Sequence, residues 1–458
     1  MVVVPAAASY SSRETVNGCI PNPGSHQSIP LFRPVMKVLS NIFRTAIRDG
    51  RVTLVGANGE ERQFGGQGPG PAVRLRLADP AFDKKILLNP ELKAAEGIMN
   101  GQIVIEEGTI HDFIELFFIN KRQFDMNPNQ IFWNGMSRRL RRFMQHNTLR
   151  NSRRNVEHHY DLGNDFYSMW LGQDLQYSCG YFPEGTETLD EAQTAKKRHI
   201  AAKLKLEPGL TVLDIGSGWG GMALYLAAVT GVRVVGVTLA EEQLKIAQAR
   251  ADYLGLGDRV EFRLQDYRRV TETFDRVVSV GMLEHVGVSH LTEFYLNVRD
   301  RLAPDGVALV HSVSSKAPPG ITGPFLRKYI FPGGYSPSLS EAFAAVERSG
   351  LWTLDTEIWR MHYAYTLEAW REGFLAQRES AVAKYDERFA KMWEIYLSAC
   401  ECAFRHGASC NFQMQLGRKR DAVPYSRSYI EVAEARLKCS EEPWIAKLHA
   451  STAAALGS

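Results

Sequence analysis

The stretch that decides the fold is Val212-Leu213-Asp214-Ile215-Gly216-Ser217-Gly218-Trp219-Gly220-Gly221, where an apolar run breaks into a glycine-rich turn. This pattern predicts a buried strand, a tight turn and the start of a helix. The Asp-x-Gly-x-Gly-x-Gly spacing lacks the Gly-Lys-Ser/Thr ending of a P-loop and the last spacing of the dinucleotide fingerprint. We therefore expect a nucleotide-like cofactor without a pyrophosphate, bound by Asp214, Gly216, Gly218 and Gly220. Such a turn also occurs in ordinary strand-to-helix connections, so the neighbouring segments must show whether this one binds a cofactor.

Three further apolar runs follow along the chain: 232–237, 260–264 and 274–280. Thr238 and Gln243 come after the first run, and Gln265 and Asp266 come after the second. Because these runs alternate with helical patterns, we expect a parallel α/β sheet, which binds ligands at the carboxyl ends of its strands. Polar groups there suit the ribose and adenine of S-adenosylmethionine, and the Asp214 carboxylate suits a cationic ligand. Each of these residues alone is an ordinary loop residue; their placement at successive strand ends favours binding.

Four other segments are more specific than the glycine-rich turn. They are His159-Tyr160-Asp161-Leu162-Gly163-Asn164-Asp165-Phe166-Tyr167, Gln176-Tyr177-Ser178-Cys179-Gly180-Tyr181-Phe182, Val278-Ser279-Val280-Gly281-Met282-Leu283-Glu284-His285-Val286-Gly287 and Lys328-Tyr329-Ile330-Phe331-Pro332-Gly333-Gly334. Between about His158 and Arg420 the chain resembles the cyclopropane-fatty-acyl-phospholipid synthase family, which includes the mycolic acid cyclopropane synthases. One departure is Ser217, where many relatives carry Cys.

The resemblance implies a Rossmann-like class I S-adenosylmethionine-dependent methyltransferase with a seven-stranded sheet. It further implies an enzyme that transfers a methylene group from S-adenosylmethionine to the cis double bond of an unsaturated acyl chain in membrane phospholipid. Tyr177 and Ser178 would lie near the methionine end of the cofactor. In this family a bound bicarbonate takes up the proton released on ring closure. The positions that match its site are Cys179, Glu284, His311 and Tyr363, with Cys400 farther out.

Each catalytic assignment has a simpler structural alternative. Glu284 could cap the following helix, and His311 could be a core histidine with satisfied hydrogen bonds. Tyr363 competes with Tyr365 for its role. Cys179 has no basic neighbour assignable from sequence, so we interpret its thiol as a weak hydrogen-bond donor and not as a nucleophile.

Other functions need the same residues. A lipid C-methyltransferase that leaves a methyl or methylene branch differs only in the fate of the cationic intermediate. A small-molecule N-methyltransferase and an inactive lipid-binding module are disfavoured by the bicarbonate set and by the intact cofactor segments.

Composition sets broad limits. The 458 residues are 45% hydrophobic and 23% charged, an ordinary balance for a globular chain of more than one domain. No run approaches the roughly 20 apolar residues that span a bilayer, and the amino terminus has no basic region before its short apolar run. We expect a cytoplasmic protein, peripherally associated with the inner face of the membrane. The six cysteines show no Cys-x-x-Cys spacing, so no metal site is expected.

The net charge of +3 is unevenly distributed. Between Lys121 and Arg154 nine basic residues face the single acid Asp125, and aromatic and aliphatic residues are interleaved with them. This pattern predicts a basic amphipathic segment suited to an anionic membrane surface. A solvated connecting helix is the alternative. Nucleic acid is a rival partner for such a patch, but nothing in the chain resembles a nucleic-acid-binding module.

We therefore expect five parts. They are a disordered segment 1–28, an N-terminal α+β domain at 29–122, the basic linker 123–157, the methyltransferase domain 158–420 with a lid insertion at about 314–340, and a helical tail 421–458. The N-terminal domain would help to hold lipid, or would serve folding or dimerisation. A homodimer is a reasonable expectation.

Overall fold

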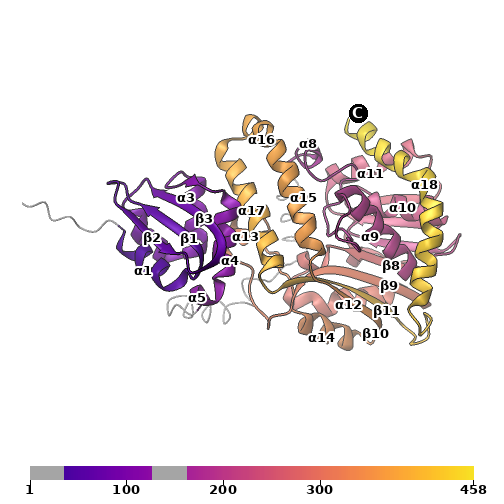
Figure 1. Ribbon diagram of the computed structural model, residues 1–458. Helices are drawn as coiled ribbons and strands as arrows, with labels where there is room; N and C mark the ends of the chain where they lie inside the picture. Colours follow the sequence, from indigo (N-terminus) through magenta and orange to yellow (C-terminus); the bar gives the residue numbers. More distant parts are fainter. Residues whose placement is uncertain (1–35, 126–161, 458) are drawn as a thin grey trace, which may run out of the picture.

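The computed structural model describes residues 36–125 and 162–457. A small N-terminal unit and a larger C-terminal unit lie side by side, with helices of the larger unit between the two sheets (Figure 1). The segment 1–28 and all but the first three residues of the expected basic linker 123–157 lie outside the described residues.

The N-terminal unit is a four-stranded sheet covered by short helices. Its elements are α1 (Lys37–Ala46), β1 (Asp49–Val55), β2 (Glu61–Gly65), β3 (Gly68–Leu77), α2 (Phe82–Lys85), η1 (Ile86–Leu88), α3 (Pro90–Met99), β4 (Ile103–Glu107), α4 (Ile110–Ile119) and α5 (Lys121–Asp125). The strand order is β2-β1-β3-β4, with β1 and β3 parallel. Val52, Leu54, Val73 and Leu75 are buried in alternation with more exposed neighbours, as half-buried strands require.

The C-terminal unit is built on a seven-stranded sheet. Its strands are β5 (Thr211–Ile215), β6 (Arg233–Thr238), β7 (Val260–Leu264), β8 (Phe274–Val280), β9 (Leu302–Ser315), β10 (Trp352–Trp359) and β11 (Ser409–Gly417). The order is β10-β11-β9-β8-β5-β6-β7. Strands β5 to β9 run parallel, and β11 is antiparallel to both β9 and β10. The expected α/β class and the seven-stranded sheet are confirmed.

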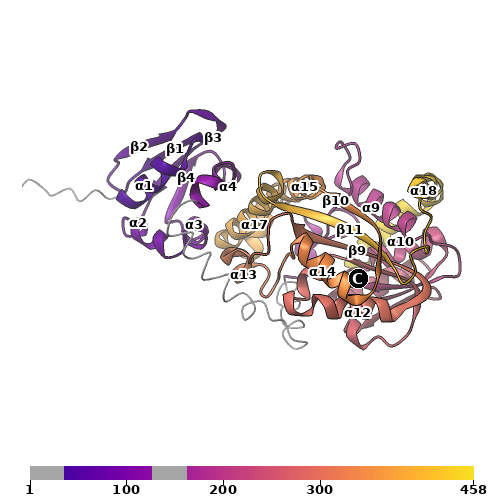
Figure 2. The same ribbon diagram turned by 90° about the horizontal axis from the view of Figure 1, so that it is seen from below.

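Helices complete this unit. They are α8 (Asn164–Ser168), α9 (Leu189–Lys203), α10 (Gly221–Thr230), α11 (Glu241–Tyr253), η2 (Tyr267–Arg269), η3 (Leu283–His285), η4 (Val288–His290), α12 (Leu291–Arg301), α13 (Pro324–Tyr329), α14 (Leu339–Ser349), α15 (His362–Ala376), α16 (Arg378–Lys384), α17 (Glu387–Arg405) and α18 (Ser428–Leu456). One apolar core packs α9, α10, α11 and α18 on one face of the sheet, and another packs α12 and α14 on the opposite face (Figure 2). Because both faces are covered, the central strands are almost continuously buried.

The two units share a third apolar core. Helices α3 and α4 of the N-terminal unit pack against α17, and α3 also packs against α13, which lies in the expected lid insertion. Glu96 on α3 accepts hydrogen bonds from Lys328 Nζ at 2.6 Å and from the Tyr329 hydroxyl at 3.0 Å. Burial raises the pKa of Glu96, but the hydrogen bonds from Lys328 and Lys93 outweigh it and lower the pKa to about 2. The carboxylate is therefore charged, and it connects α13 to the N-terminal unit.

Candidate active site

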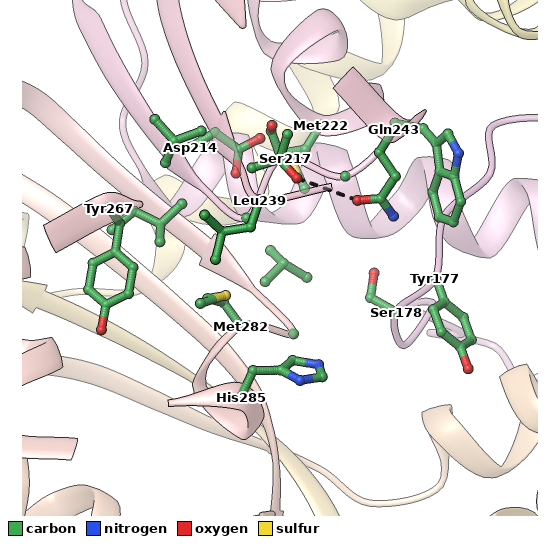
Figure 3. A pocket seen from close by; sticks show the side chains of 18 of the residues that line it. Tyr177, Ser178, Asp214, Ser217, Met222, Leu239, Gln243, Tyr267, Met282 and His285 are labelled. Carbon is green, nitrogen blue, oxygen red and sulfur yellow. Dashed lines mark hydrogen bonds between the residues drawn. The ribbon is translucent and has the colours of Figure 1, made fainter. Parts of the chain in front are cut away.

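A pocket opens at the carboxyl ends of β5, β6 and β8 (Figure 3). Eight of the ten residues predicted to bind the cofactor line it: Tyr177, Ser178, Asp214, Gly216, Gly218, Thr238, Gln243 and Gln265. The lining also includes five side chains that are not among these ten: Met222, Leu239, Tyr267, Met282 and His285. These residues follow the same strand ends, but only the folded sheet shows which of them face inward.

The glycine-rich turn is shaped by backbone conformations that favour glycine. Gly216 has φ +86°, and its N–H donates to Val237 O at 2.9 Å, which holds the turn against β6. Gly220, predicted to bind the cofactor, is outside the pocket lining. A Cβ atom there would lie 2.7 Å from the Phe262 ring and 3.0 Å from Ala247, so this glycine allows α10 to pack closely.

Asp214 is a buried carboxylate at the end of β5. Among the described residues, its Oδ2 has no hydrogen-bond partner. Burial raises its pKa to about 7, although the charge of Lys196 opposes this shift. A carboxylate in this position gains a partner when a cationic ligand enters the pocket.

The loops after β6 and β7 form the other side of the pocket. Thr238 Oγ1 accepts a hydrogen bond from the Ala240 N–H at 3.2 Å and lies 3.5 Å from Gln243 Oε1. Asp266, predicted to face the adenine, is not part of the lining. Its carboxylate accepts the Arg268 backbone N–H at 3.0 Å and pairs with the Arg268 guanidinium at 2.7 Å, so it fixes the start of η2. The next residue, Tyr267, faces the pocket instead.

Glu284 is the most unusual predicted catalytic residue. It lies in η3, beside the pocket residues Met282 and His285, and its Oε1 accepts the Val313 N–H at 2.5 Å. Among the described residues, Oε2 has no partner. Burial raises the pKa of Glu284 to about 7, so near neutral pH the group can donate a proton as well as accept one.

His311 lies on β9 but is held by β11. Its Nε2 is 3.2 Å from Asn411 Nδ2, its Nδ1 is 3.1 Å from Gln413 Nε2, and its ring contacts Trp359 edge-on at 5.0 Å. Burial, together with Lys196 and Lys203, lowers its pKa well below the ordinary value, so the ring is neutral. A neutral imidazole accepts at only one nitrogen. One of the two amides must therefore present its oxygen, and Asn411 Oδ1 has no other partner among the described residues.

The remaining predicted catalytic residues lie outside the pocket lining. Cys179 Sγ donates to Gly180 O at 3.2 Å, and burial raises the pKa of its thiol. Burial raises the pKa of Cys400 to about 12. The ring of Tyr363 packs against Phe404 and Trp370, with centroids 4.9 and 5.6 Å away. None of these three lines the pocket, nor do Glu284 and His311.

An aromatic cluster connects the pocket with the helices. Tyr177, which lines the pocket, donates or accepts a 2.7 Å hydrogen bond with the Tyr396 hydroxyl and packs on Trp370 at 5.2 Å. Phe331, from the lid segment, contacts both Tyr396 at 5.7 Å and His285 at 6.1 Å. The cluster gives the site an apolar wall that begins at the pocket and continues between α13, α15 and α17.

In the described ranges, 36–125 and 162–457, no group of His, Cys, Asp and Glu side chains could hold a metal ion. In the same ranges, no helix has the length and apolar character needed to cross a membrane.

The sheet order and the pocket at its strand ends define a Rossmann-like methyltransferase fold. A model of the mycolic acid cyclopropane synthetase family matches residues 147–414, which is more than half of the chain. The chain belongs to this family.

Individual relatives agree with this membership. Cyclopropane-fatty-acyl-phospholipid synthase of Escherichia coli is 44% identical over 54% of this chain and 63% of its own length. Tuberculostearic acid methyltransferase UfaA1 of Mycobacterium tuberculosis is 36% identical over 58% of this chain and 66% of its own length. The structure of mycolic acid cyclopropane synthase CmaA1 in complex with SAH and CTAB is 30% identical with a TM-score of 0.54, covering 58% of this chain and 97% of that one. The chain thus matches just under two thirds of the length of these two curated relatives.

Proposed function

We propose that this protein transfers a methylene group from S-adenosylmethionine to the cis double bond of an unsaturated acyl chain in membrane phospholipid, forming a cyclopropane fatty acid. The observation that carries the proposal is the junction of a polar pocket with a buried aromatic wall, beside the half-satisfied carboxyl group of Glu284. The named activities of the related E. coli and mycobacterial proteins support it.

The pocket residues suit S-adenosylmethionine. The Asp214 carboxylate, whose Oδ2 has no partner among the described residues, is suited to the positive charges of the cofactor, and Thr238, Gln243 and Gln265 are suited to the ribose and adenine. When bound, the cofactor supplies an electrophilic methyl group. The residues hold that methyl group in one place while water is excluded, which converts an encounter with a weakly nucleophilic alkene into a positioned reaction.

The aromatic cluster suits the acyl chain. Tyr177, Trp370, Tyr396 and Phe331 present apolar faces next to the pocket. Their faces exclude water from the chain, and they stabilise positive charge that develops on the acyl carbon.

Glu284 is the residue best suited to the proton-transfer step. Its Oε2, which has no hydrogen-bond partner among the described residues, can hold a bicarbonate through an acidic O–H, because its raised pKa keeps much of the group protonated near neutral pH. His311 and Cys179 fit a direct contact less well, since their polar atoms already face Asn411, Gln413 and Gly180. We assign them, with Tyr363 and Cys400, to the walls around the bicarbonate position.

We also propose that the protein works at an anionic membrane surface. The basic residues of 121–154 support this, and so does a hollow on the N-terminal unit lined by Arg44, Arg48 and Arg62. Neutralising Arg138, Arg139, Arg141 and Arg142 should weaken sedimentation with anionic liposomes in a salt-sensitive way. Unchanged liposome binding would assign this segment to a connecting role only.

The decisive experiment supplies purified protein with methyl-labelled S-adenosylmethionine, bicarbonate and liposomes of a cis-monounsaturated phospholipid. We expect released fatty acids that are heavier by one CH2, with cyclopropane protons in NMR and no alkene left at that site. The control omits bicarbonate. Lipid that acquires no label would overturn the proposal.

A second candidate is a lipid C-methyltransferase that leaves a methyl or methylene branch. The similarity to tuberculostearic acid methyltransferase favours keeping it. The same experiment separates the two, because a branched or exomethylene product lacks cyclopropane protons.

A further inference from the structure

Helix α9 buries three lysines, which differ in how their charges are paired. Lys197 Nζ pairs with Asp174 Oδ2 at 2.5 Å, and Lys203 Nζ lies 3.4 Å from Asp355 and 3.5 Å from Glu357. Lys196, which is 0% exposed, forms no ion pair within the described part of the chain. Its Nζ donates only to two neutral oxygens, Gln176 Oε1 at 2.9 Å and Ser178 Oγ at 2.7 Å.

A buried cation without a counter-ion is unfavourable, because desolvation costs several kcal/mol that hydrogen bonds to neutral groups only partly offset. Burial and the neighbouring charge of Lys197 lower the pKa of Lys196 to about 7, although Cys179, Asp174 and Asp214 oppose this shift. An anion that binds within reach of this ammonium would remove the penalty. The buried ammonium group of Lys196 is therefore a positive charge that an anionic ligand can pair with.

The contacts of Lys196 direct that charge toward the cofactor pocket. Gln176 and Ser178 both line the pocket, and α9 holds the same stretch a second time through Gln193 Nε2, which donates to Ser178 O at 2.9 Å. Because Ser178 Oγ already accepts from Lys196, its own proton is free to be donated elsewhere. Figure 3 shows the Ser178 hydroxyl extending into the open part of the pocket.

The pocket thus has two buried charges of opposite sign. Asp214 Oδ2 has no hydrogen-bond partner among the described residues, and Lys196 Nζ donates to Ser178 Oγ. A zwitterion fits such a pair. S-adenosylmethionine carries its single anionic group, a carboxylate, and its ammonium group on the same amino-acid end.

We propose that Lys196 is a positioning residue for the amino-acid end of the cofactor: it orients Ser178 and supplies the positive charge that the cofactor carboxylate requires. This inference rests on the proposed use of S-adenosylmethionine. It assigns a role to a lysine in the sequence Ala195-Lys196-Lys197-Arg198, a pattern that is typical of an exposed helix face.

The test compares two ligands by calorimetry. S-adenosylhomocysteine carries the amino-acid end, whereas 5′-methylthioadenosine has the same nucleoside and thioether without it. In Lys196→Met we expect the affinity for S-adenosylhomocysteine to fall about ten- to hundredfold, the usual range for a hydrogen bond to a charged group, while the affinity for methylthioadenosine changes less than about threefold. Ser178→Ala should show the same selective loss without altering the buried charge.

Lys203→Met is the matched control, since it removes another buried lysine from the same helix without touching a pocket residue. It should leave the ratio of the two affinities unchanged.

Equal weakening of both ligands by Lys196→Met would overturn the inference in favour of a purely structural lysine. Unchanged affinities, with a higher bicarbonate requirement instead, would overturn it by assigning the charge to the other anion. Wild-type protein that binds neither nucleoside would overturn the proposed function itself, and the inference with it.

Discussion

Buried polar side chains in the two halves of the large sheet differ in how they are paired. At the ends of β5 and β8, Asp214 and Glu284 each keep a buried carboxylate oxygen without a partner in the described ranges. On β9 and β11, Asn411 and Gln413 each lie within hydrogen-bond distance of a different ring nitrogen of His311, and Asn411 Oδ1 gains a partner when its amide presents that oxygen to the ring. The difference separates a site prepared for ligands from a polar network that stabilises the fold, because a buried polar atom without a partner costs free energy until something binds it.

The largest expected effect comes from substituting Glu284, which belongs to the ligand-binding half of this comparison. Glu284→Gln retains an oxygen for the Val313 N–H but removes the titratable group. We expect turnover to fall about 10²- to 10⁴-fold, the usual contribution of acid–base catalysis, and S-adenosylhomocysteine affinity to stay within about threefold. Single-turnover kinetics and calorimetry measure the two. A variant that loses cofactor affinity and keeps turnover would contradict the assignment.

Asp214→Asn should reduce S-adenosylhomocysteine affinity about ten- to hundredfold, because it removes a buried counter-charge. Without ligand, Asp214→Asn should instead gain stability relative to the wild type as the pH rises. The folded-state pKa of Asp214 is raised to about 7, so its contribution to stability is present below the unfolded-state pKa, near 4, and is lost as the pH rises through 7.

Thermal melts of the ligand-free proteins should therefore show the stability of Asp214→Asn rising relative to that of the wild type between about pH 4 and pH 7. A difference that is constant with pH would mean that the carboxylate already has a partner.

His311→Ala tests the other half of the sheet. Removing the ring leaves the Asn411 and Gln413 amides buried without their partner and leaves a cavity beside Trp359. We expect the free energy of unfolding to fall by about 2–4 kcal/mol, with cofactor affinity unchanged and turnover reduced through the disturbed β9. Denaturant titration measures the first quantity. An unchanged midpoint would place His311 with the ligand-binding groups instead.

The smallest effect should come from Cys179→Ser. Burial raises the pKa of this thiol and its Sγ already donates to Gly180 O, so no reactive thiolate is present to lose. Turnover should stay within about fivefold of wild type. Wild-type Cys179 should also resist alkylation by iodoacetamide in the folded protein, as peptide mass spectrometry would show. Rapid labelling there would contradict this account.

Much of this site could be predicted from the sequence, because strand ends and glycine positions are local features. Asp214, Thr238, Gln243 and Gln265 line the pocket as their positions after apolar runs indicated. Asp266 lies outside the pocket lining, and only the folded chain shows that its carboxylate pairs with Arg268, so its contact with the cofactor stays a prediction.

Lys196 was missed for a related reason. It follows Ala195 and precedes another lysine and an arginine, a pattern typical of an exposed helix face. Tertiary packing of α9 under residues 174–178 buries it instead. Strand β2 was also missed, because Glu61, Arg62 and Gln63 are polar and only pairing with β1 makes them a strand.

The sequence by itself determined the α/β class, the glycine-rich turn and the family, because these depend on hydrophobic periodicity and on short motifs read along the chain. Only the tertiary structure decided which buried polar atoms are paired. The partners of His311 lie 100 and 102 residues away along the chain, and Lys196 is 20 residues from its partner Gln176. Hydrogen bonding acts over about 3 Å of space and not along the sequence, so whether a buried group is prepared for a ligand or already satisfied is settled only when the chain has folded.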